Sequence, residues 1–410
     1  MKELSKPLLE GVEEFEIVLA TYENFVLGYS FRRLQDDLFC LVQSFANSGH
    51  RASVRTVASG GKFMASGSSD ETIQLYNMAS RKEMGSLVKH DGTINALRFH
   101  GQTHLFSASD DGTICVWDTG SWQCLRTLKG HKQAVNDIAV HSSGKLLLSV
   151  SRDKSLYTWN LVKGRPAFIT NIKVEASRVE WCPTDGPGDL FLVIHANQCD
   201  IYSTAAGGIV GSIDFGKKIS DLAFIGRHLV LSGEEGKVNI FDLSVRDDLG
   251  RVAPSCLVDF NADPSGARIK CVAYAGPSEL MGCHYLVTAT SEGVITVWRV
   301  NIASESSDDK NKVRQLTNTT AGCRVTACDI YIKATESDGP SAGDDRKAAA
   351  KQETVLKKTT ATKKRPSKSE NYQKKIDERR QQQFIVEPKK IRTLDIKQVR
   401  KPGTVKGKKT

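Results

Sequence analysis

Hydrophobic and polar residues follow a two-residue period over most of this chain, from about Phe15 to Ile332. VNDIAVH (Val135–His141) and SLYTWNL (Ser155–Leu161) alternate, whereas KLLLSVS (Lys145–Ser151) between them is apolar. Turn residues interrupt these runs roughly every 8–12 positions, which is typical of short antiparallel strands. The region lacks segments with the 3.6-residue period of a helix, so the pattern predicts an all-β fold.

A repeat of about forty residues organises these strands. Its clearest copies are Ser66–Asn77 (SGSSDETIQLYN), Ser107–Asp118 (SASDDGTICVWD) and Ser149–Asn160 (SVSRDKSLYTWN). Each copy has a serine, an aspartate four positions later, and an aromatic residue six positions after the aspartate. A histidine precedes each aromatic residue by 26 to 28 positions.

The repeat continues in a weaker form on both sides of these copies. Equivalent aromatic residues are Tyr29, Tyr202, Phe241 and Trp298, and the residue six positions before the aromatic one is acidic in six of the seven repeats. The residues at that position are Glu23, Asp70, Asp111, Asp153, Ala196, Glu235 and Glu292. Seven repeats of four strands predict a seven-bladed β-propeller.

These residues resemble the WD-repeat family. In that family a histidine, a serine, an aspartate and a tryptophan form a hydrogen-bonded chain within one blade, and such a buried polar chain rigidifies the fold when every member has a partner. By position, three tetrads are expected: His50–Ser66–Asp70–Tyr76, His90–Ser107–Asp111–Trp117 and His131–Ser149–Asp153–Trp159. The first has a phenol in place of the indole. Repeats five to seven lack the Gly-His pair, so we expect them to depend more on apolar packing.

Ring closure can also be predicted. The first repeat begins at Glu14–Glu23 and lacks its own first strand, while Arg324–Ile332 follows the seventh repeat and has the pattern of a first strand. We expect this C-terminal strand to complete the first blade and to cover its open edge. The domains are then a propeller over residues 1–332, closed by strand 324–332, and a tail over residues 333–410. Two insertions, Ser244–Ala267 and Ser304–Lys312, are expected to form loops.

The net charge of +10 is divided unequally between these two parts. Residues 346–410 carry 22 Lys or Arg and 6 Asp or Glu, a net +16, which leaves −6 for the rest of the chain. The tail is rich in Ser, Thr, Lys, Pro and Glu, so we expect it to be disordered. Its charge indicates a polyanionic partner. A solvated tail without a specific partner is the alternative.

Basic clusters in the tail are candidate sites for nuclear import and RNA binding. The candidates are Lys363, Lys364, Arg365, Lys368, Lys389 and Lys390. We expect them to neutralise phosphates with little sequence preference, because aromatic residues that stack on bases are nearly absent from the tail. The segment Ile376–Val386 is a candidate for a short helix that forms on a partner.

The sequence carries no signature of an enzyme. Gly-x-Ser-x-Gly, P-loop, Gly-x-Gly-x-x-Gly and His-Glu-x-x-His motifs are absent. His90, Ser107 and Asp111 could suggest a catalytic triad, but the same trio recurs in neighbouring repeats. The ten cysteines include no Cys-x-x-Cys pair and are expected to be buried, reduced thiols. We predict a non-enzymatic protein without cofactor, metal or small-molecule substrate, and, since no run of 18 apolar residues occurs, without a membrane span.

The residues just before the turn acids form a candidate partner-binding rim. They are Ser69, Asp110, Arg152, Glu234 and Ser291. We expect them to lie beside the turns between the second and third strands of their blades, exposed on one face of the ring, where WD-family proteins often bind partners. The mixture of Arg152 with Asp110 and Glu234 favours a charge-selective partner, and ordinary solvated turns are the alternative.

A closer resemblance lies in the segment Lys129–Ile172. Its matching residues are His141, Ser143, Gly144, Lys145, Asp153, Trp159, Asn160, Gly164, Arg165 and Phe168. The segment is similar to that of the p21-activated kinase-interacting protein family of animals and fungi, and departs from it at Ser142, where the family has proline. The resemblance implies a nucleolar scaffold in assembly of the large ribosomal subunit and a negative regulator of p21-activated kinases.

Two functions remain open. The first is a WD-repeat scaffold in 60S ribosome biogenesis and pre-rRNA processing, found in the nucleus and nucleolus as a monomer within a larger assembly. It would bind pre-60S proteins and, through its tail, rRNA. The second is a cytoplasmic kinase-binding signalling regulator without a ribosomal role. The basic tail favours the first. A ubiquitin-ligase adaptor role is open to any WD protein, and no residue here is specific to it.

Overall fold

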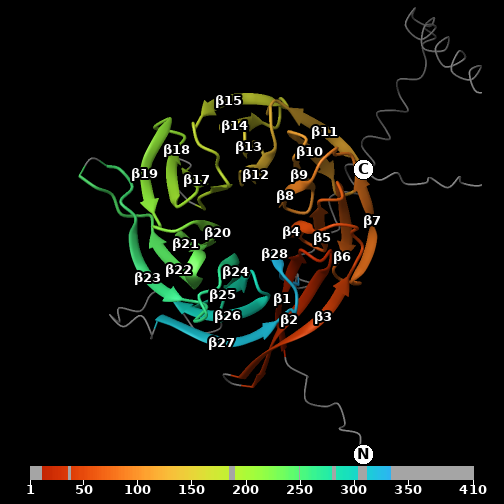
Figure 1. Ribbon diagram of the computed structural model, residues 1–410. Helices are drawn as coiled ribbons and strands as arrows, with labels where there is room; N and C mark the ends of the chain where they lie inside the picture. The colour runs from red at the N-terminus through yellow and green to blue at the C-terminus, as the bar shows by residue number, and fades with distance from the viewer. Residues whose placement is uncertain are drawn as a thin grey trace, which may run out of the picture. The chain divides into compact units, whose positions relative to one another are not determined.

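The computed structural model describes residues 12–35, 38–183, 190–248, 250–278, 283–302 and 312–333 of the chain. The chain divides into two units, Met1–Asp338 and Gly339–Thr410, and all described residues lie in the first. That unit is a ring of seven four-stranded antiparallel sheets, called blades A to G here in order around the ring (Figure 1). The prediction of an all-β, seven-bladed propeller is confirmed.

Blade A draws its strands from both ends of the described chain, and the other blades each use four consecutive strands. Blade A consists of β28 (Val325–Tyr331), β1 (Val12–Thr21), β2 (Val26–Gln35) and β3 (Leu38–Asn47). Blade B consists of β4 (Val54–Gly60), β5 (Phe63–Ser68), β6 (Thr72–Asn77) and β7 (Lys82–Val88). Blade C consists of β8 (Ile94–His100), β9 (His104–Ser109), β10 (Thr113–Asp118) and β11 (Cys124–Lys129). Blade D consists of β12 (Val135–Val140), β13 (Leu146–Ser151), β14 (Ser155–Asn160) and β15 (Arg165–Asn171).

The last three blades follow the same plan. Blade E consists of β16 (Arg178–Trp181), β17 (Leu190–His195), β18 (Gln198–Ser203) and β19 (Gly208–Asp214). Blade F consists of β20 (Ile219–Ile225), β21 (His228–Gly233), β22 (Lys237–Asp242) and β23 (Ser255–Asn261), with the 3-10 turn η1 (Glu234–Gly236) between β21 and β22. Blade G consists of β24 (Ile269–Pro277), β25 (Cys283–Thr290), β26 (Val294–Asn301) and β27 (Val313–Thr320).

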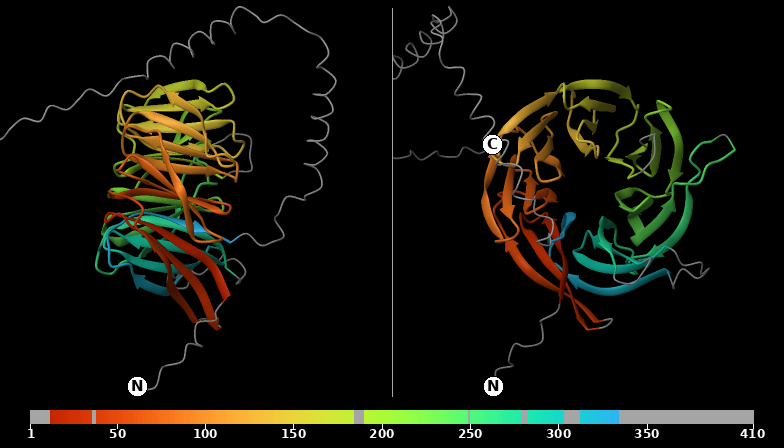
Figure 2. Two further views of the ribbon diagram at one scale, coloured as in Figure 1. Left: turned by 90° about the vertical axis from the view of Figure 1, so that its right-hand side faces the viewer. Right: turned by 180° about the vertical axis from the view of Figure 1, so that it is seen from behind.

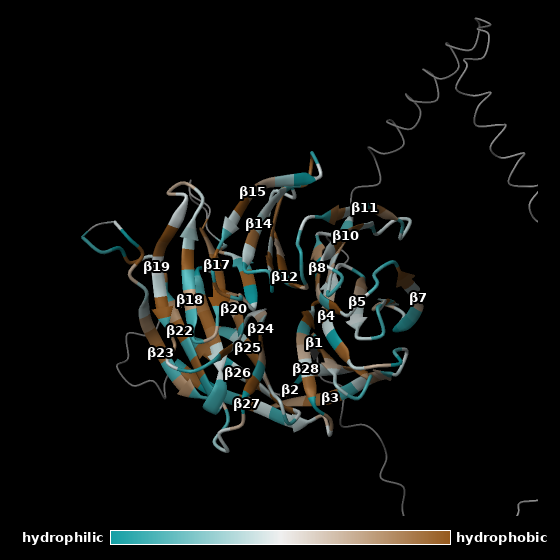
Figure 3. Ribbon diagram, turned by 45° about the horizontal axis from the view of Figure 1, so that its top comes forward, coloured by the Kyte–Doolittle hydropathy of each residue, from teal (hydrophilic) through white to brown (hydrophobic). Residues whose placement is uncertain are grey.

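The position of a strand within its blade determines its pattern of apolar residues. The second strand is covered by neighbouring blades on both faces, so β13 is a nearly continuous apolar run that is buried from Leu147 to Ser151. The outermost strand is mostly exposed, as in β15. Figure 3 shows hydrophobic segments along many of the strands, and hydrophilic segments both in the connections and on strands such as β15 and β18.

Seven apolar clusters make up the core among the described residues, and each fills the space between two neighbouring blades. The cluster between blades C and D, for example, contains Ile114 and Leu128 from one blade and Ile138 and Trp159 from the other. No blade therefore buries its apolar faces alone, and the ring is stable only when every neighbour is in place.

Blade A closes the ring by pairing the two ends of the propeller. β1 pairs with β28 in an antiparallel register that runs from Glu16 opposite Tyr331 to Thr21 opposite Val325. Aromatic rings reinforce the joint with blade G: the Phe31 ring lies 4.7 Å from that of Phe15 and 5.4 Å from that of Tyr285, measured between centroids. Figure 2 shows the two ends of the ring side by side in this blade.

The expected loop over Ser244–Ala267 is wrong in part. This segment contains β23, which pairs with β22 and forms the outer edge of blade F. Only the hairpin before it, with an isolated bridge between Arg246 and Val252, stands out from the ring (Figure 1). The strand was missed because SCLVDFN follows a long polar connection and has no spacing signal. The second insertion, Ser304–Lys312, lies outside the described residues except for Lys312.

Candidate functional site

Polar tetrads tie the strands of blades C and D together. In blade C the Trp117 indole donates to the Ser107 hydroxyl (2.9 Å), which lies 2.8 Å from Nε2 of His90. Nδ1 of His90 lies 2.9 Å from Asp111. Because an ionised carboxylate only accepts, Nδ1 donates to Asp111, and Nε2 accepts from Ser107. All four predicted residues therefore form one continuous hydrogen-bonded chain.

Blade D repeats this arrangement. Trp159 donates to Ser149 (2.8 Å), Ser149 lies 2.7 Å from Nε2 of His131, and Nδ1 of His131 lies 3.1 Å from Asp153. Burial lowers the pKa of His131, although Asp153 opposes this effect. The imidazole is thus neutral at pH 7, as the donor order requires.

Blade B has an incomplete tetrad. His50 contacts Ser66 at 2.8 Å and Asp70 at 3.1 Å, as in the other two blades. Tyr76 occupies the tryptophan position, but no hydrogen bond of ordinary geometry reaches its buried hydroxyl within the described part of the chain. Burial raises the pKa of Tyr76 to about 12, although the nearby Ser66 opposes this effect. The phenol thus lies beside Ser66 without the aligned hydrogen bond that the indole makes in blades C and D, and it contributes apolar packing instead.

Blades E and G use other pairs. In blade G the Trp298 indole donates to Thr288 (2.9 Å), with no histidine in the chain. In blade E, His195 lies 2.8 Å from Asp200 on the neighbouring strand. The serine, histidine and aspartate trio is thus an internal tie that recurs in three successive blades, which is the arrangement of a structural element rather than of a reaction centre.

Replacement of Asp111 by alanine should destabilise the protein by about 1–3 kcal/mol, because His90 and the backbone amides of Asp91 and Thr113 lose their common acceptor. Replacement of Glu292, which occupies the same repeat position but is exposed, should change stability by less than about 0.5 kcal/mol. Urea unfolding measures both changes. Equal losses at the two sites would contradict the role assigned to the tetrad.

The tetrads also predict acid sensitivity. Burial opposes ionisation of Asp111, but hydrogen bonds from His90 and Thr113 outweigh it and hold the pKa of this carboxyl below its ordinary value. A depressed carboxyl pKa stabilises the fold above the unfolded value of about 3.9, and the contribution disappears as the pH falls below it. The lowered pKa of His131 acts in the same direction, starting below about 6.5. We expect the melting temperature to fall as the pH decreases below about 6.5, where the contribution of His131 is lost, and to fall further below about pH 4, where that of Asp111 is lost. A melting temperature that stays constant between about pH 7 and pH 2 would contradict this.

The predicted rim is less exposed than expected. Of the five candidates Ser69, Asp110, Arg152, Glu234 and Ser291, only Arg152 is exposed, and the other four are half-buried. A backbone hydrogen bond recurs in each of these blades: the amide of the rim residue donates to a carbonyl just before the innermost strand, as from Glu234 to Lys218 and from Ser291 to Arg268. This bond places all five turns beside the innermost strands. Arg152 reaches Glu175 of the next blade at 3.7 Å.

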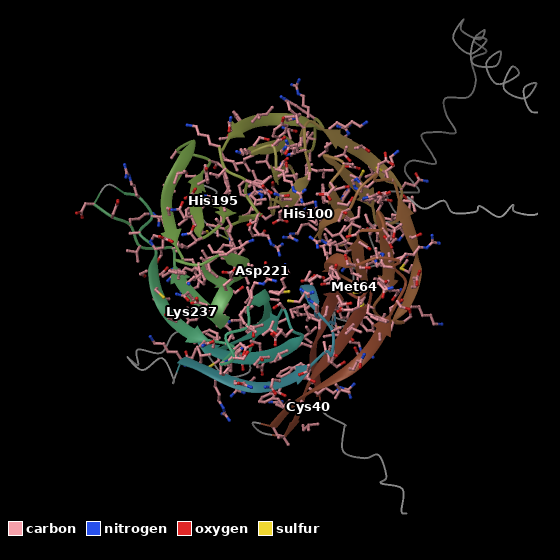
Figure 4. The ribbon with its side chains drawn as sticks, viewed as in Figure 1. Cys40, Met64, His100, His195, Asp221 and Lys237 are labelled. Carbon is pink, nitrogen blue, oxygen red and sulfur yellow. The ribbon has the colours of Figure 1, made fainter. Side chains whose placement is uncertain are left out.

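The innermost strands enclose a central channel of about 890 Å³ whose lining is rich in charged residues. A buried carboxylate, Asp137, lies 3.3 Å from the guanidinium of Arg98 and 3.9 Å from that of Arg178. Arg178 also pairs with Asp221 at 2.9 Å, and Arg98 with Glu180 at 3.6 Å. Figure 4 shows Asp221 at the inner wall of the ring. Burial and the nearby Asp137 raise the pKa of Glu180 to about 7, although the two arginines oppose this.

Three aspartates also link neighbouring blades across the channel wall. Asp137 accepts from the amide of Val179 (3.2 Å), and Asp221 from that of Val272 (3.1 Å). Asp329 accepts from both the amide and the hydroxyl of Ser59, at 2.6 and 2.7 Å. These residues were not predicted from the sequence. The signal was present, because VNDIAV, ISDLAF and ACDIY each place an aspartate inside an otherwise apolar first strand.

Other kinds of site are not found in the part of the chain that the structure covers. No group of three or more His, Cys, Asp or Glu side chains is arranged there to hold a metal ion. Nor does any described helix have the length and hydrophobicity needed to cross a membrane. The tail candidates Lys363, Lys364, Arg365, Lys368, Lys389 and Lys390, and the candidate helix Ile376–Val386, lie outside the described residues.

Comparison with known proteins agrees with this geometry. The WD domain, G-beta repeat family matches residues 39–77, 81–118 and 122–160. Together with the seven blades and their tetrads, these matches define a WD-repeat propeller, a class that typically serves as a scaffold for other proteins.

The similarity to individual proteins extends over most of the chain. A p21-activated protein kinase-interacting protein 1-like of Danio rerio is 40% identical over 321 residues, which cover 78% of this chain and 81% of the relative. The p21-activated protein kinase-interacting protein 1 of Homo sapiens is 34% identical over 77% of each chain. Protein MAK11 of Saccharomyces cerevisiae is 28% identical over 50% of this chain and 55% of its own. The chain belongs to the family of p21-activated protein kinase-interacting protein 1.

Proposed function

We propose that this protein is a non-enzymatic scaffold in the nucleolar assembly of the large ribosomal subunit. The observation that carries the proposal is the opposite charge of its two parts, a net −6 for residues 1–345 and a net +16 for residues 346–410. A propeller of this class binds other proteins, and a strongly basic tail binds the phosphates of a nucleic acid. A chain with both parts can therefore bind a particle that contains both protein and rRNA. The family resemblance of the segment Lys129–Ile172 supports the same role.

In this proposal the propeller and the tail bind different components of the particle. The ring contacts pre-60S proteins, and the tail neutralises rRNA phosphates through its basic clusters. Lys363, Lys364, Arg365 and Lys368 form a cluster of the kind that import receptors bind, which accounts for entry into the nucleus.

Sedimentation of nuclear lysate through a sucrose gradient tests this role. The protein should co-migrate with pre-60S particles, and treatment with RNase should move it to the top of the gradient. Depletion of the protein should reduce mature 60S subunits relative to 40S subunits. A protein that stays at the top of the gradient in untreated lysate would exclude the ribosomal role.

A second candidate function is the regulation of p21-activated kinases. The names of several relatives favour it, since these proteins are called p21-activated protein kinase-interacting, and one in Schizosaccharomyces pombe, 25% identical over 304 residues, is called Shk1 kinase-binding protein 15. Titration of the purified protein into a p21-activated kinase assay tests this function. Inhibition that saturates with dose supports it, and unchanged kinase activity excludes it.

Deletion of residues 346–410 should separate the two parts. The shortened protein should keep the melting temperature of the full chain, because the tail has too little apolar surface to offset the entropy of ordering. Its affinity for single-stranded RNA at 150 mM salt should fall at least tenfold, and the salt dependence of binding should flatten. Undiminished RNA binding would move the nucleic-acid contact to the propeller. Circular dichroism and fluorescence anisotropy measure the two properties.

A further inference from the structure

One mouth of the central channel carries a group of positively charged side chains on blades B, F and G. Arg55 and Lys270 are the second residues of β4 and β24, while Lys218 and Arg268 directly precede β20 and β24. All four line the channel. Since the backbone carbonyls of Lys218 and Arg268 accept from the turns that carry Glu234 and Ser291, these cations lie on the same face as the predicted rim. They are called the cationic collar below.

The collar has no counter-charge of its own. Within the described part of the chain, none of its four side chains forms an ion pair, in contrast to Arg152, which reaches Glu175. Lys270 is half-buried, and its pKa is lowered by burial and by the neighbouring Arg178 and Arg268, with Asp221 opposing. Asp221 cannot neutralise the collar, because it already pairs with Arg178 at 2.9 Å. Uncompensated cations at a cavity attract an anionic ligand.

The excess of positive charge is confined to the mouth of the channel. Deeper in the channel, the carboxyl groups of Asp137, Glu180, Asp221 and Asp329 outnumber the guanidinium groups of Arg98 and Arg178, with which the first three of them pair. A ligand with a negative charge on every unit, such as RNA, would bring phosphates against these carboxyls on entering. A peptide can place carboxylates at the collar and neutral or basic side chains deeper, and so match both layers.

We propose that the cationic collar is a docking site for an acidic peptide segment of a partner protein. This inference rests on the proposed scaffold function, for which it names the chemistry of the partner. The ligand class is an extended segment with several Asp or Glu residues in one block, followed by uncharged or basic residues that enter the channel.

Fluorescence anisotropy with the full-length protein at 150 mM salt tests the site. The probe is a labelled 15-residue peptide that begins with four Asp or Glu residues and continues with Ser, Asn and Lys. A second peptide replaces the acids by Asn and Gln, and a labelled oligouridine RNA is the third probe. The test variant is K218E/R268E, which changes two exposed side chains, with K218Q/R268Q as a milder version. The control K82E/K163E makes the same charge change at exposed lysines beside outer strands, so the contribution of the tail is constant.

The acidic peptide should bind the K218E/R268E variant at least tenfold more weakly than it binds the wild type. Its affinity for the K82E/K163E control should be less than twofold below that for the wild type. K218Q/R268Q should lie between them, and the amide peptide should bind all forms equally weakly. RNA affinity should be the same in both glutamate variants.

Equal affinity of the acidic peptide for both glutamate variants would overturn the proposal. Loss of RNA binding in K218E/R268E alone would make the collar a nucleic-acid site and would also overturn it. This assay uses purified protein, so its outcome is independent of the sucrose gradient. Peptide binding by a protein that does not co-sediment with pre-60S particles would exclude the ribosomal role and support the peptide site. Co-sedimentation without peptide binding at the collar would support the ribosomal role and exclude the peptide site.

Discussion

Truncation after Arg324, which removes β28 and everything beyond it, should abolish the cooperative unfolding transition of the propeller. β1 would lose its partner along the register from Glu16 to Thr21, leaving an exposed edge next to an open blade. The cut would also remove the hydrogen bonds from the Ser59 amide to Asp329 and from the Thr326 hydroxyl to the carbonyl of Val54, which join blade A to blade B. Circular dichroism melting and size-exclusion chromatography should show a broad transition and aggregation.

Truncation after Arg346 is the matched control, because it retains β28 and removes most of the tail. This shorter protein should elute as a monomer and melt within about 2 °C of the full chain, since its change in stability should be a few tenths of a kcal/mol at most. If the chain cut after Arg324 melts in the same way as this control, the ring does not depend on its C-terminal strand.

Replacement of Asp137 by alanine should destabilise the protein by about 3–5 kcal/mol, the largest loss expected from a single side chain here. Asp137 is 1% exposed and is the shared carboxylate of Arg98 and Arg178. Its removal leaves two guanidinium groups in the channel wall with less counter-charge, and it also leaves the amide of Val179 without its acceptor. Urea unfolding monitored by tryptophan fluorescence measures the change.

Glu175 provides the comparison for Asp137. It also pairs with an arginine, Arg152, but both side chains are more than half exposed, so its replacement by alanine should cost less than about 1 kcal/mol. A loss at Asp137 no larger than that at Glu175 would mean that the channel network contributes little to stability.

The spacing of the repeats was sufficient to predict the propeller, because an aromatic residue recurs in all seven repeats and an acid precedes it by six positions in six of them, and because a strand pattern like that of Arg324–Ile332 had no other partner. The tetrads of blades C and D could be located to the residue for the same reason. Tyr76 shows the limit of this reasoning: spacing identifies its position, but only geometry shows that the phenol hydroxyl makes no link.

The arginines of the channel could not be predicted from the repeats, because they differ from blade to blade, whereas the aspartates inside the first strands left a signal. Arg98, Arg178 and Asp137 meet only because three neighbouring blades place different side chains toward one axis. The rim residues were predicted to be more exposed than they are, for a related reason. A turn residue appears solvated in the sequence, whereas its exposure depends on tertiary contacts, which leave Glu234 half-buried and Arg152 exposed although both turns have the same backbone hydrogen bond.

The pairing of β1 with β28 also determines how long β1 lacks its partner strand during synthesis of the chain. Glu16 and Tyr331 are 315 positions apart, so at 5–20 residues per second the ribosome needs roughly 15–60 s to deliver the second strand after the first. During that interval blade A has three strands, and the edge of β1 is available to any other strand in the cell. The nascent chain is therefore most vulnerable to mispairing at its beginning, and a chaperone that covers β1 would act over the whole of propeller synthesis.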